Sequence, residues 1–318
     1  MHFPVYQIND DDFDDFEDMG TKSKFWYTDS VDGKQYLFKS THTEDKRGNP
    51  IVRQGEDWAE KIACELAKKL GLPHAEYDLA NHNGEQGTRS LNFSQKGDSL
   101  TFGNTLLEQV FKTSLPEDDK GTQRVQELKY VAALCVIEIV SAPKAWRPTA
   151  NIKSAFAVFI GYVMFDCLIS NQDRHNQNWG MVTDTAGNTS LAPSFDHAAS
   201  LGRNESDQTR QTKLTTKDKN QTVESYVKKC KSHFYNQGER LKTFEAYQLL
   251  SCLAPSAAVE WIERLEAITD EDIKEIVDAV PEAIMSDLSK QFCTAILKAN
   301  SIRIIEFKDF LLETYLKP

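Results

Sequence analysis

The feature that most constrains the fold is the stretch AFAVFIGYVMFDCLI at residues 155–169, which is apolar at nearly every position. A helix of this composition has no polar side to present to water, so other elements must surround it. We predict a helix over residues 151–169 at the centre of a large core. The polar cluster NQDRHNQNWG follows at once, at residues 171–180. A buried helix can hold such a cluster rigidly, which makes the cluster the first candidate for a functional site.

Hydrophobic spacing predicts that most of the second half of the chain is helical. Thr269 and Asp272 have the spacing of a capping box, and Pro281 suits the first turn of the helix that follows. A short hairpin between WGMV and SLAP interrupts this region, and the polar run 203–222 is predicted to be a long mobile loop. Besides the central helix, the predicted helices cover residues 123–141, 240–254, 256–267, 270–280 and 282–298.

The first hundred residues follow a different pattern. The stretch 24–39 predicts two strands joined by the Asp-Gly turn at residues 32–33, and residues 55–73 predict a single amphipathic helix. We therefore predict an α+β protein with a two-lobed, protein-kinase-like fold. A small β-rich N-lobe with one main helix would cover residues 1–105, and a mostly helical C-lobe would cover residues 106–318.

Composition excludes several classes of protein. The 318 residues are 40% hydrophobic and 27% charged, as in ordinary globular proteins. A formal net charge of −11 disfavours attraction to a phosphate backbone, so direct nucleic-acid binding is not expected. The chain has neither a signal-peptide pattern nor a long apolar run, so we predict a cytoplasmic protein without a membrane span. The 6 cysteines form no CxxC pair, and Cys and His form no zinc pattern, so we expect reduced cysteines and no zinc.

Asp173 and Asn178 in the polar cluster have the residue types and spacing that suit phosphoryl transfer from ATP. This reaction needs a carboxylate to orient the attacking hydroxyl and oxygen ligands for Mg²⁺. A tight loop with the pattern Asp-x-x-x-x-Asn can supply both, and the catalytic loop of protein kinases has this spacing. Arg174 and His175 between them would organise the loop or bind phosphate. Asp196, beyond the hairpin in SFDHAASLG, is the candidate second metal ligand.

The N-terminal part offers candidate residues for the nucleotide. Lys39 at the end of a predicted strand is placed to contact phosphates, and Glu60 on the next helix is placed to hold that lysine. The loop around Gly20, Lys22 and Ser23 precedes the hairpin, where backbone amides can cover phosphates. Taken singly, each signal is more often structural: a capping network, a surface lysine, a solvated glutamate or an ordinary turn. Their order along the chain favours a nucleotide site, because unrelated structural residues do not readily reproduce it.

With these residues in place, the sequence resembles the HipA-like kinases, including the shorter HipT-type members. The matching segments, from residue 20 to about residue 202, are GTKSK, YLFK, EDWAEKIACELAKKLGLP, FDCLISNQDRHNQNWG and SFDHAASLG. The last two are the specific part, and GTKSK is the loosest. The resemblance implies an ATP- and Mg²⁺-dependent kinase that phosphorylates serine or threonine on a protein. In such an enzyme Asp173 would be the base, and Asn178 and Asp196 would be the magnesium ligands.

The resemblance also implies partners. Some members are toxins of toxin–antitoxin modules, paired with a DNA-binding antitoxin, and they target aminoacyl-tRNA synthetases. Another branch consists of effectors that act outside the toxin setting, which leaves a secreted role open. For this chain the resemblance implies a protein substrate, with an aminoacyl-tRNA synthetase as one candidate, and a DNA-binding antitoxin in the toxin case.

The sequence departs from the family in its first residues. Only nineteen residues precede Gly20, so we expect that the additional N-terminal subdomain of HipA is missing or supplied by another chain. FEDM at residues 16–19 occupies the place of the family's autophosphorylated serines. Ser23 is the nearby candidate for autophosphorylation, with an ordinary loop serine as the alternative. Two other functions stay open: a kinase for a small molecule or lipid, because the loop does not report the acceptor, and a nucleotide-binding pseudokinase that acts by docking.

Overall fold

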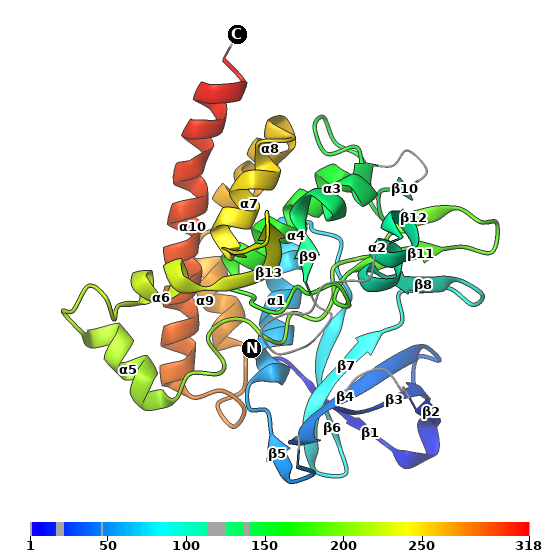
Figure 1. The fold of residues 1–318 in the computed structure, drawn as a ribbon. Helices are drawn as coiled ribbons and strands as arrows, with labels where there is room; N and C mark the ends of the chain where they lie inside the picture. The colour runs from blue at the N-terminus through cyan, green and yellow to red at the C-terminus, as the bar shows by residue number, and fades with distance from the viewer. Residues whose placement is uncertain (1, 17–21, 46, 113–124, 137–139, 318) are drawn as a thin grey trace.

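Strands dominate the N-terminal part of the protein and helices the C-terminal part (Figure 1). The computed structural model describes residues 2–16, 22–45, 47–112, 125–136 and 140–317. The observed elements confirm the α+β class. The lobe boundary at residue 105 stays a prediction.

The N-terminal sheet has 7 strands in the order β1-β6-β7-β4-β3-β2, with β5 paired to β4. β3 and β4 run antiparallel with Trp26 opposite Leu37, which confirms the predicted hairpin. Tyr36 and Phe38 lie on one face of β4 and form a small core with Ile8. The strands are β1 Val5–Ile8, β2 Phe13–Phe16, β3 Lys22–Thr28, β4 Gln35–Glu44, β5 Pro50–Val52, β6 Tyr77–His82 and β7 Glu85–Leu91, with a 3-10 turn η1 at Asp10–Asp12.

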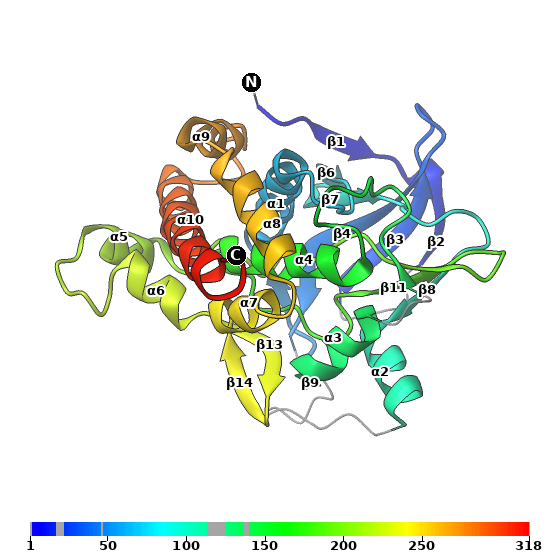
Figure 2. The ribbon, with the colours of Figure 1, turned by 90° about the horizontal axis from the view of Figure 1, so that it is seen from above.

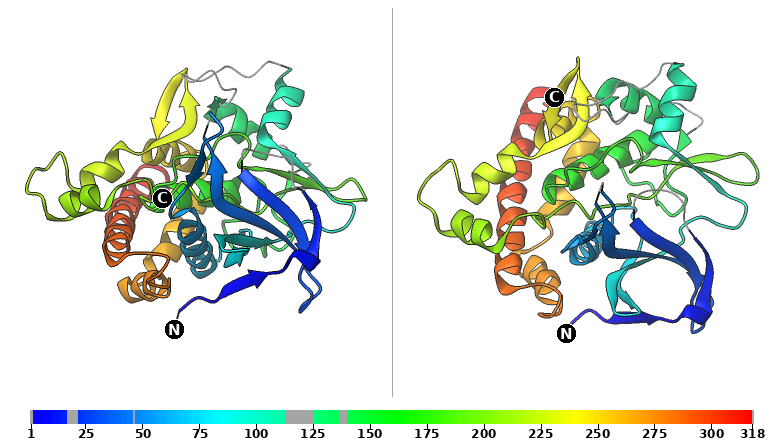
Figure 3. Two further views of the ribbon diagram at one scale, coloured as in Figure 1. Left: turned by 90° about the horizontal axis from the view of Figure 1, so that it is seen from below. Right: turned by 60° about the horizontal axis from the view of Figure 1, so that its bottom comes forward.

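The helices gather on one side of this sheet, and α1 lies between the sheet and the other helices (Figure 3). No helix in the described part of the chain is long and apolar enough to cross a lipid bilayer. The helices are α1 Glu56–Leu70, α2 Gly103–Phe111, α3 Leu128–Val136, α4 Ala155–Leu168, α5 Asp207–Thr215, α6 Val223–Lys229, α7 Thr243–Ser251, α8 Pro255–Glu266, α9 Asp270–Asp278 and α10 Asp287–Tyr315.

Helix α1 connects the two parts of the fold, because it packs against β6 and β7 and also against α8 and α9. Glycines define both of its ends. Gly55 has φ +83°, and a Cβ there would lie 2.7 Å from the indole of Trp58, so a larger residue would be strained and crowded. Gly71 adopts the left-handed conformation and its N–H donates to the carbonyl of Ala67. These caps confirm the helix predicted at residues 55–73.

Helix α4 is the predicted central helix, and all of its residues are buried. Ser154 caps its N-terminus by accepting a hydrogen bond from the N–H of Ala157. Gly161 allows α8 to approach closely, because a Cβ there would clash with the indole of Trp261. α3, α7, α8 and α10 all pack against α4, which lies in their midst in the view from above (Figure 2). The helix is therefore a rigid base for the loop that follows it.

Two smaller sheets flank the helices. One has the order β10-β12-β11-β8, and the other has the order β14-β13-β9. β11 and β12 pair antiparallel with Met181 opposite Leu191, which confirms the hairpin predicted between WGMV and SLAP. The strands are β8 Ser99–Phe102, β9 Gln126–Glu127, β10 Val140–Ser141, β11 Gly180–Thr183, β12 Thr189–Leu191, β13 Lys231–Asn236 and β14 Glu239–Lys242.

Several predicted boundaries were wrong. The run 203–222 contains helix α5, which Ser206 caps, and is not one long loop. Helix α10 begins after its cap Ser286, so Pro281 lies in the preceding turn, and the helix runs far beyond residue 298. Both ends of the helix predicted at 123–141 include short strands. Those strands pair with distant segments, and such tertiary pairing overrides local hydrophobic spacing.

Candidate active site

Arg174 is the anchor of the polar cluster that follows α4. Its guanidinium is 1% exposed and binds Asp166 of α4 through two hydrogen bonds, at 2.8 and 2.9 Å. The same side chain donates to the backbone carbonyls of Asn178, at 2.7 Å, and Phe195, at 3.1 Å. It therefore joins the central helix, the polar loop and the segment of Asp196. The predicted loop-organising role of Arg174 agrees with these contacts, since a planar guanidinium can serve several fixed acceptors.

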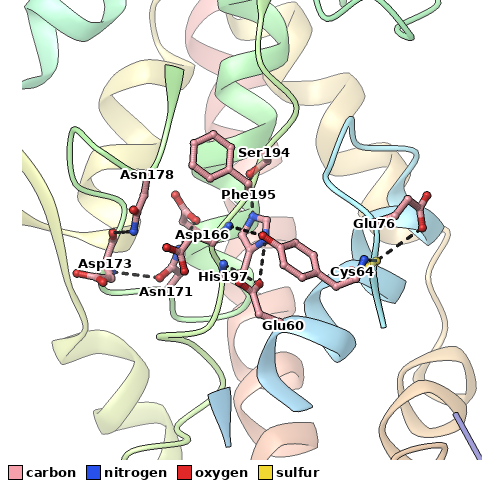
Figure 4. Close-up of polar contacts among 12 residues, drawn as sticks. Glu60, Cys64, Glu76, Asp166, Asn171, Asp173, Asn178, Ser194, Phe195 and His197 are labelled. Carbon is pink, nitrogen blue, oxygen red and sulfur yellow. Dashed lines mark hydrogen bonds and ion pairs between the residues drawn. The ribbon is translucent and has the colours of Figure 1, made fainter. Parts of the chain in front are cut away.

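Asn171 gives the loop its turn. Its amide nitrogen donates to Asp166 at 2.8 Å, and its amide oxygen accepts the backbone N–H of Asp173 at 3.1 Å (Figure 4). Asp166 thus receives donors from both Asn171 and Arg174, which compensates the burial of its charge. The backbone of Asp173 is therefore held in place by the buried network.

The carboxylate of Asp173 faces solvent at the end of this network. Its side chain is 40% exposed, with Nε2 of His233 at 3.5 Å and Nε2 of His175 at 3.9 Å from Oδ1. A base has to reach the proton of an incoming hydroxyl, and this exposure allows it. His233 comes from β13, so sequence spacing alone did not reveal it as a neighbour.

Asn178 and Asp196 both offer oxygen atoms beside this loop. The amide nitrogen of Asn178 donates to the backbone carbonyl of Asp173 at 2.7 Å, which leaves the amide oxygen as the possible ligand atom. Asp196 has φ +57°, a left-handed conformation that costs about 1–2 kcal/mol in a residue other than glycine. Its backbone N–H donates to the hydroxyl of Tyr77 at 3.2 Å. Such strain is common at functional sites, where the surroundings hold an unfavourable backbone.

Lys39 reaches this segment from β4. Its ammonium lies 2.9 Å from Oδ1 of Asp196. Burial opposes the charge of Lys39, but the carboxylates of Asp196 and Glu60 outweigh it and raise the pKa of the ammonium above its usual value. Asp196 binds Lys39 directly, and the charge of the predicted partner Glu60 contributes to the same shift.

Glu60 also holds the segment of Asp196 from α1. Its Oε2 accepts the backbone N–H of His197 at 2.8 Å. Nε2 of His197 lies 2.7 Å from the hydroxyl of Ser194, which Arg174 also contacts at 2.8 Å. Burial and then the charge of Arg174 lower the pKa of His197, so the imidazole is neutral at physiological pH. Glu60 of α1 and Arg174 of the polar loop thus both hold the backbone of the segment that contains Asp196.

Sequence reasoning missed Arg203 and Glu56. Nη2 of Arg203 donates to Oε1 of Glu56, at the start of α1, at 2.8 Å. Burial lowers the pKa of the Arg203 guanidinium, and the carboxylates of Glu56, Asp173 and Asp196 oppose this effect. Arg203 therefore carries a positive charge close to both candidate catalytic carboxylates. The only sequence signal was its place directly after SFDHAASLG, in a run predicted to be a loop.

The predicted phosphate loop is only partly visible. Gly20 lies outside the described residues. The backbones of Lys22 and Ser23 belong to β3, where Lys22 pairs with Thr43. Their predicted contacts with phosphate therefore stay predictions.

The donor atoms around Asp173 suit Mg²⁺ and a phosphate chain. Asn178 and Asp196 supply hard oxygen ligands, the kind that Mg²⁺ prefers. Lys39 and Arg203 supply the positive charges that phosphates need. The arrangement can position a hydroxyl, a divalent ion and a polyphosphate, the three parts of a phosphoryl-transfer reaction.

Solved structures share this fold. A proinflammatory kinase of Helicobacter pylori, CtkA, superposes with a TM-score of 0.73 at 18% identity, over 99% of this chain and 100% of that chain. HipA of Shewanella oneidensis MR-1, solved with HipB and operator DNA, superposes with a TM-score of 0.58 at 13% identity, over 94% of this chain and 67% of that chain. These likenesses establish the predicted two-lobed kinase fold. No curated protein matches the chain.

A family match covers most of the sequence. Residues 19–287 match the HipA-like C-terminal domain, a span that includes Lys39, Glu60, Asp173, Asn178 and Asp196. This match and the shared fold support a kinase function. The chain therefore belongs to the HipA-like C-terminal domain family, as the motifs in its sequence predicted.

Proposed function

We propose that the protein transfers the γ-phosphoryl group of ATP to a serine or threonine hydroxyl of a protein substrate. The observation that carries this proposal is the partly exposed carboxylate of Asp173 beside Asn178. Arg174 joins this loop to the segment in which Asp196 binds Lys39, and the charge of Arg203 acts on both Asp173 and Asp196. Three separate segments contribute to this cluster: β4 with Lys39, the loop 173–178, and the stretch 196–203 that carries Asp196 and Arg203. A purely structural network would have no need for a solvent-accessible carboxylate at its end.

Each residue has a separate task in this proposal. Asp173 accepts a hydrogen bond from the attacking hydroxyl and takes its proton as transfer proceeds. Lys39 neutralises phosphate charge, and its contact with Asp196 keeps it beside the metal ligands. Mg²⁺, when bound by Asn178 and Asp196, would supply charge neutralisation on the phosphate oxygens. Arg174 and Glu60 contact the backbone of the same segments and hold these groups in position.

A labelling experiment tests the proposal. Purified protein is incubated with γ-labelled ATP, Mg²⁺ and a cell lysate, beside the variants Asp173→Asn and Asp309→Asn. Asp309 is an exposed carboxylate on α10, away from the site, and serves as the matched control. Labelled protein bands should appear with the wild type and the control and vanish with Asp173→Asn. Labelling that survives in Asp173→Asn would remove the assigned base.

The same experiment separates the alternative functions. A small-molecule or lipid kinase would consume ATP and place the label in a fraction that dialysis or solvent extraction removes from protein. A pseudokinase would bind ATP in a calorimeter and transfer no label to any acceptor. The loop geometry does not distinguish acceptors, so the fate of the label decides.

We further propose a toxin–antitoxin setting in the cytoplasm, supported by the solved HipA that lies in a complex with HipB and operator DNA. A net charge of −11 argues that any DNA contact is made by the partner. An aminoacyl-tRNA synthetase is the first purified substrate to test, and affinity capture of a small DNA-binding protein encoded beside this chain tests the partner. Labelled Ser23 in the absence of other protein would establish autophosphorylation there.

A further inference from the structure

We infer that Cys64, His74 and Glu76 form a binding site for a thiophilic divalent cation of the Zn²⁺ class, separate from the Asn178–Asp196 site. One ligand atom from each residue lies within 4.8 Å of the other two. The cluster joins α1 to the segment between α1 and β6, on the side of Glu60 away from Asp173 in Figure 4. The sequence predicted no zinc, because the three residues have no recognised motif spacing.

The hydrogen bonding of the His74 imidazole suits it to bind a metal ion. Its Nδ1 lies 2.6 Å from the backbone carbonyl of Leu72, and a carbonyl only accepts, so Nδ1 carries the proton. In the neutral imidazole Nε2 is then the nitrogen with the lone pair that can bind a metal ion. The side chain is only 9% exposed, and among the described residues Nε2 has no hydrogen-bond partner. A protonated nitrogen bonded to a backbone carbonyl is the usual arrangement behind a metal-binding histidine.

Cys64 and Glu76 complete the set. The Cys64 thiol is buried on α1, accepts the backbone N–H of Tyr77 at 3.3 Å and lies 3.9 Å from Oε2 of Glu76. Oε1 of Glu76 lies 3.7 Å from Nε2 of His74. Ligand bonds to Zn²⁺ of about 2.0–2.3 Å bring tetrahedral ligands to about 3–4 Å from one another. Small side-chain movements therefore suffice to enclose an ion.

The chemistry of the donors selects the cation. Sulfur and imidazole nitrogen favour Zn²⁺ and disfavour Mg²⁺, which prefers oxygen. Glu76 is half exposed and pairs with Lys68 at 3.2 Å, so this carboxylate can exchange the ammonium for a cation that enters from solvent. The fourth coordination position would be open to water.

The position of the cluster gives the cation a consequence for the active site. Cys64 lies one helical turn after Glu60, which holds the N–H of His197. The other side of the cluster is tied to the same segment, because the N–H of Ala75 donates to the carbonyl of Ser194 at 2.9 Å. A bound cation would therefore fix α1 to residues 74–76. The hydrogen bond between Ala75 and Ser194 would pass this restraint to the segment that leads to Asp196. This effect on turnover rests on the proposed kinase function, whereas binding itself does not.

Cobalt titration tests the site directly. Chelator-treated protein is titrated with Co²⁺, and the thiolate-to-cobalt charge-transfer band in the near ultraviolet is followed. One equivalent should bind with this band, and Zn²⁺ should displace it. Cys64→Ser should abolish the band, and His74→Gln and Glu76→Gln should weaken binding at least about tenfold, since even changes around the ligands typically cost that much. Cys252→Ser, a change at a partly exposed cysteine outside the cluster, should keep the band.

The outcomes are distinguishable. Absence of the band in the wild type, or a band that persists in Cys64→Ser, overturns the site. Glu76→Gln guards against a folding artefact, because this side chain is half exposed and the variant is expected to fold. The band should survive in Asp196→Asn, which separates this site from the proposed magnesium site. A protein that shows the band but never transfers phosphate would refute the proposed function and leave the cation site standing.

Discussion

Asp166 and Asp173 carry the same carboxylate at two ends of one short stretch, yet their surroundings differ sharply. The side chain of Asp166 is 5% exposed and is bonded by Asn171 and twice by Arg174. The side chain of Asp173 is 40% exposed, with an imidazole of His233 at 3.5 Å. One polar cluster thus contains a buried structural layer, in which Asp166 and Arg174 fix the backbone, and a partly exposed layer with the carboxylate of Asp173, the candidate base.

The difference shows how a candidate catalytic carboxylate can be held in place while it stays accessible to solvent. The fork of Arg174 satisfies Asp166 and two backbone carbonyls, so the loop has its shape before any ligand arrives. Asp173 is held through its backbone N–H by Asn171. The Asp173 carboxylate is thereby positioned while its side chain remains 40% exposed.

Asp173→Asn should give the largest effect on catalysis. Loss of a general base typically costs about 10²- to 10⁴-fold in turnover. Stability should change by less than about 1 kcal/mol, because the side chain is partly exposed and asparagine has nearly the same size. Label transfer and urea denaturation of the same preparation measure both quantities. A large loss of stability would show that Asp173 belongs to the structural layer after all.

Asp166→Ala should show the opposite pattern. Removing this carboxylate leaves the buried charge of Arg174 without its ion-pair partner, which typically costs about 3–5 kcal/mol. The free energy of unfolding from urea titration measures this cost. The apolar-for-apolar change Ile169→Val, at the same end of the buried segment, is the matched control and should cost about 1 kcal/mol. Equal losses in the free energy of unfolding for the two variants would show that the Arg174–Asp166 ion pair contributes no more than ordinary apolar packing.

Asp57, on α1, is a third carboxylate to compare with Asp166. It is buried as well, but among the described residues no arginine forms a two-bond contact with it. Burial raises the pKa of Asp57 to about 6, while backbone N–H groups at the start of α1 oppose the shift. The folded state therefore holds the proton more tightly than the unfolded chain, whose carboxyl titrates near 3.8. Stability from this group is complete below pH 3.8 and falls as the pH rises to about 6.

A shift of this size corresponds to a loss of about 2 kcal/mol between pH 4 and pH 7. Asp57→Asn cannot ionise and should not show this decline. Urea denaturation of wild type and variant at both pH values measures the difference. If the wild type and Asp57→Asn had parallel pH profiles, the burial penalty assigned to Asp57 would be absent.

The candidate catalytic residues could be named from the sequence because they lie in contiguous motifs, and their catalytic roles stay predictions. Asp173 and Asn178 share one loop, and Asp196 follows a hairpin whose turn and strands have local signals. The central helix was equally clear, since its composition permits only a buried position. The described contacts of Lys39 and Glu60 agree with their predicted neighbourhood, although Asp196 binds the lysine directly.

Other features depend on contacts that no local pattern encodes. His233 reaches Asp173 because β13 pairs with β9, a strand hidden inside a predicted helix. A turn after α1 brings the chain back beside the helix, and this return places His74 and Glu76 next to Cys64. Arg203 was placed in a loop, since nothing in the sequence shows that Glu56 stands opposite it. Long-range side-chain pairs of this kind require the fold itself.

Arg203 shares features of both the structural layer and the partly exposed layer. Its substitution should have the smallest effect of the changes proposed. It is buried like Arg174, yet its charge acts on Asp173 and Asp196 while its hydrogen bond goes to Glu56. Arg203→Lys keeps the charge and loses the planar fork, so turnover should fall about tenfold, in the range of coupling energies between contacting residues.

A double-mutant cycle with Glu56→Gln identifies how Arg203 acts. If Glu56 positions Arg203, the two substitutions together should cost little more in turnover than either alone, with a coupling energy of about 1–2 kcal/mol. If Arg203 acts directly on the phosphates, Arg203→Lys should lower turnover equally with or without Glu56. Lys213→Gln on α5 serves as the control for loss of a positive charge outside the site. Full turnover in Arg203→Lys would assign Arg203 to the structural layer, because phosphoryl transfer would then not need its guanidinium.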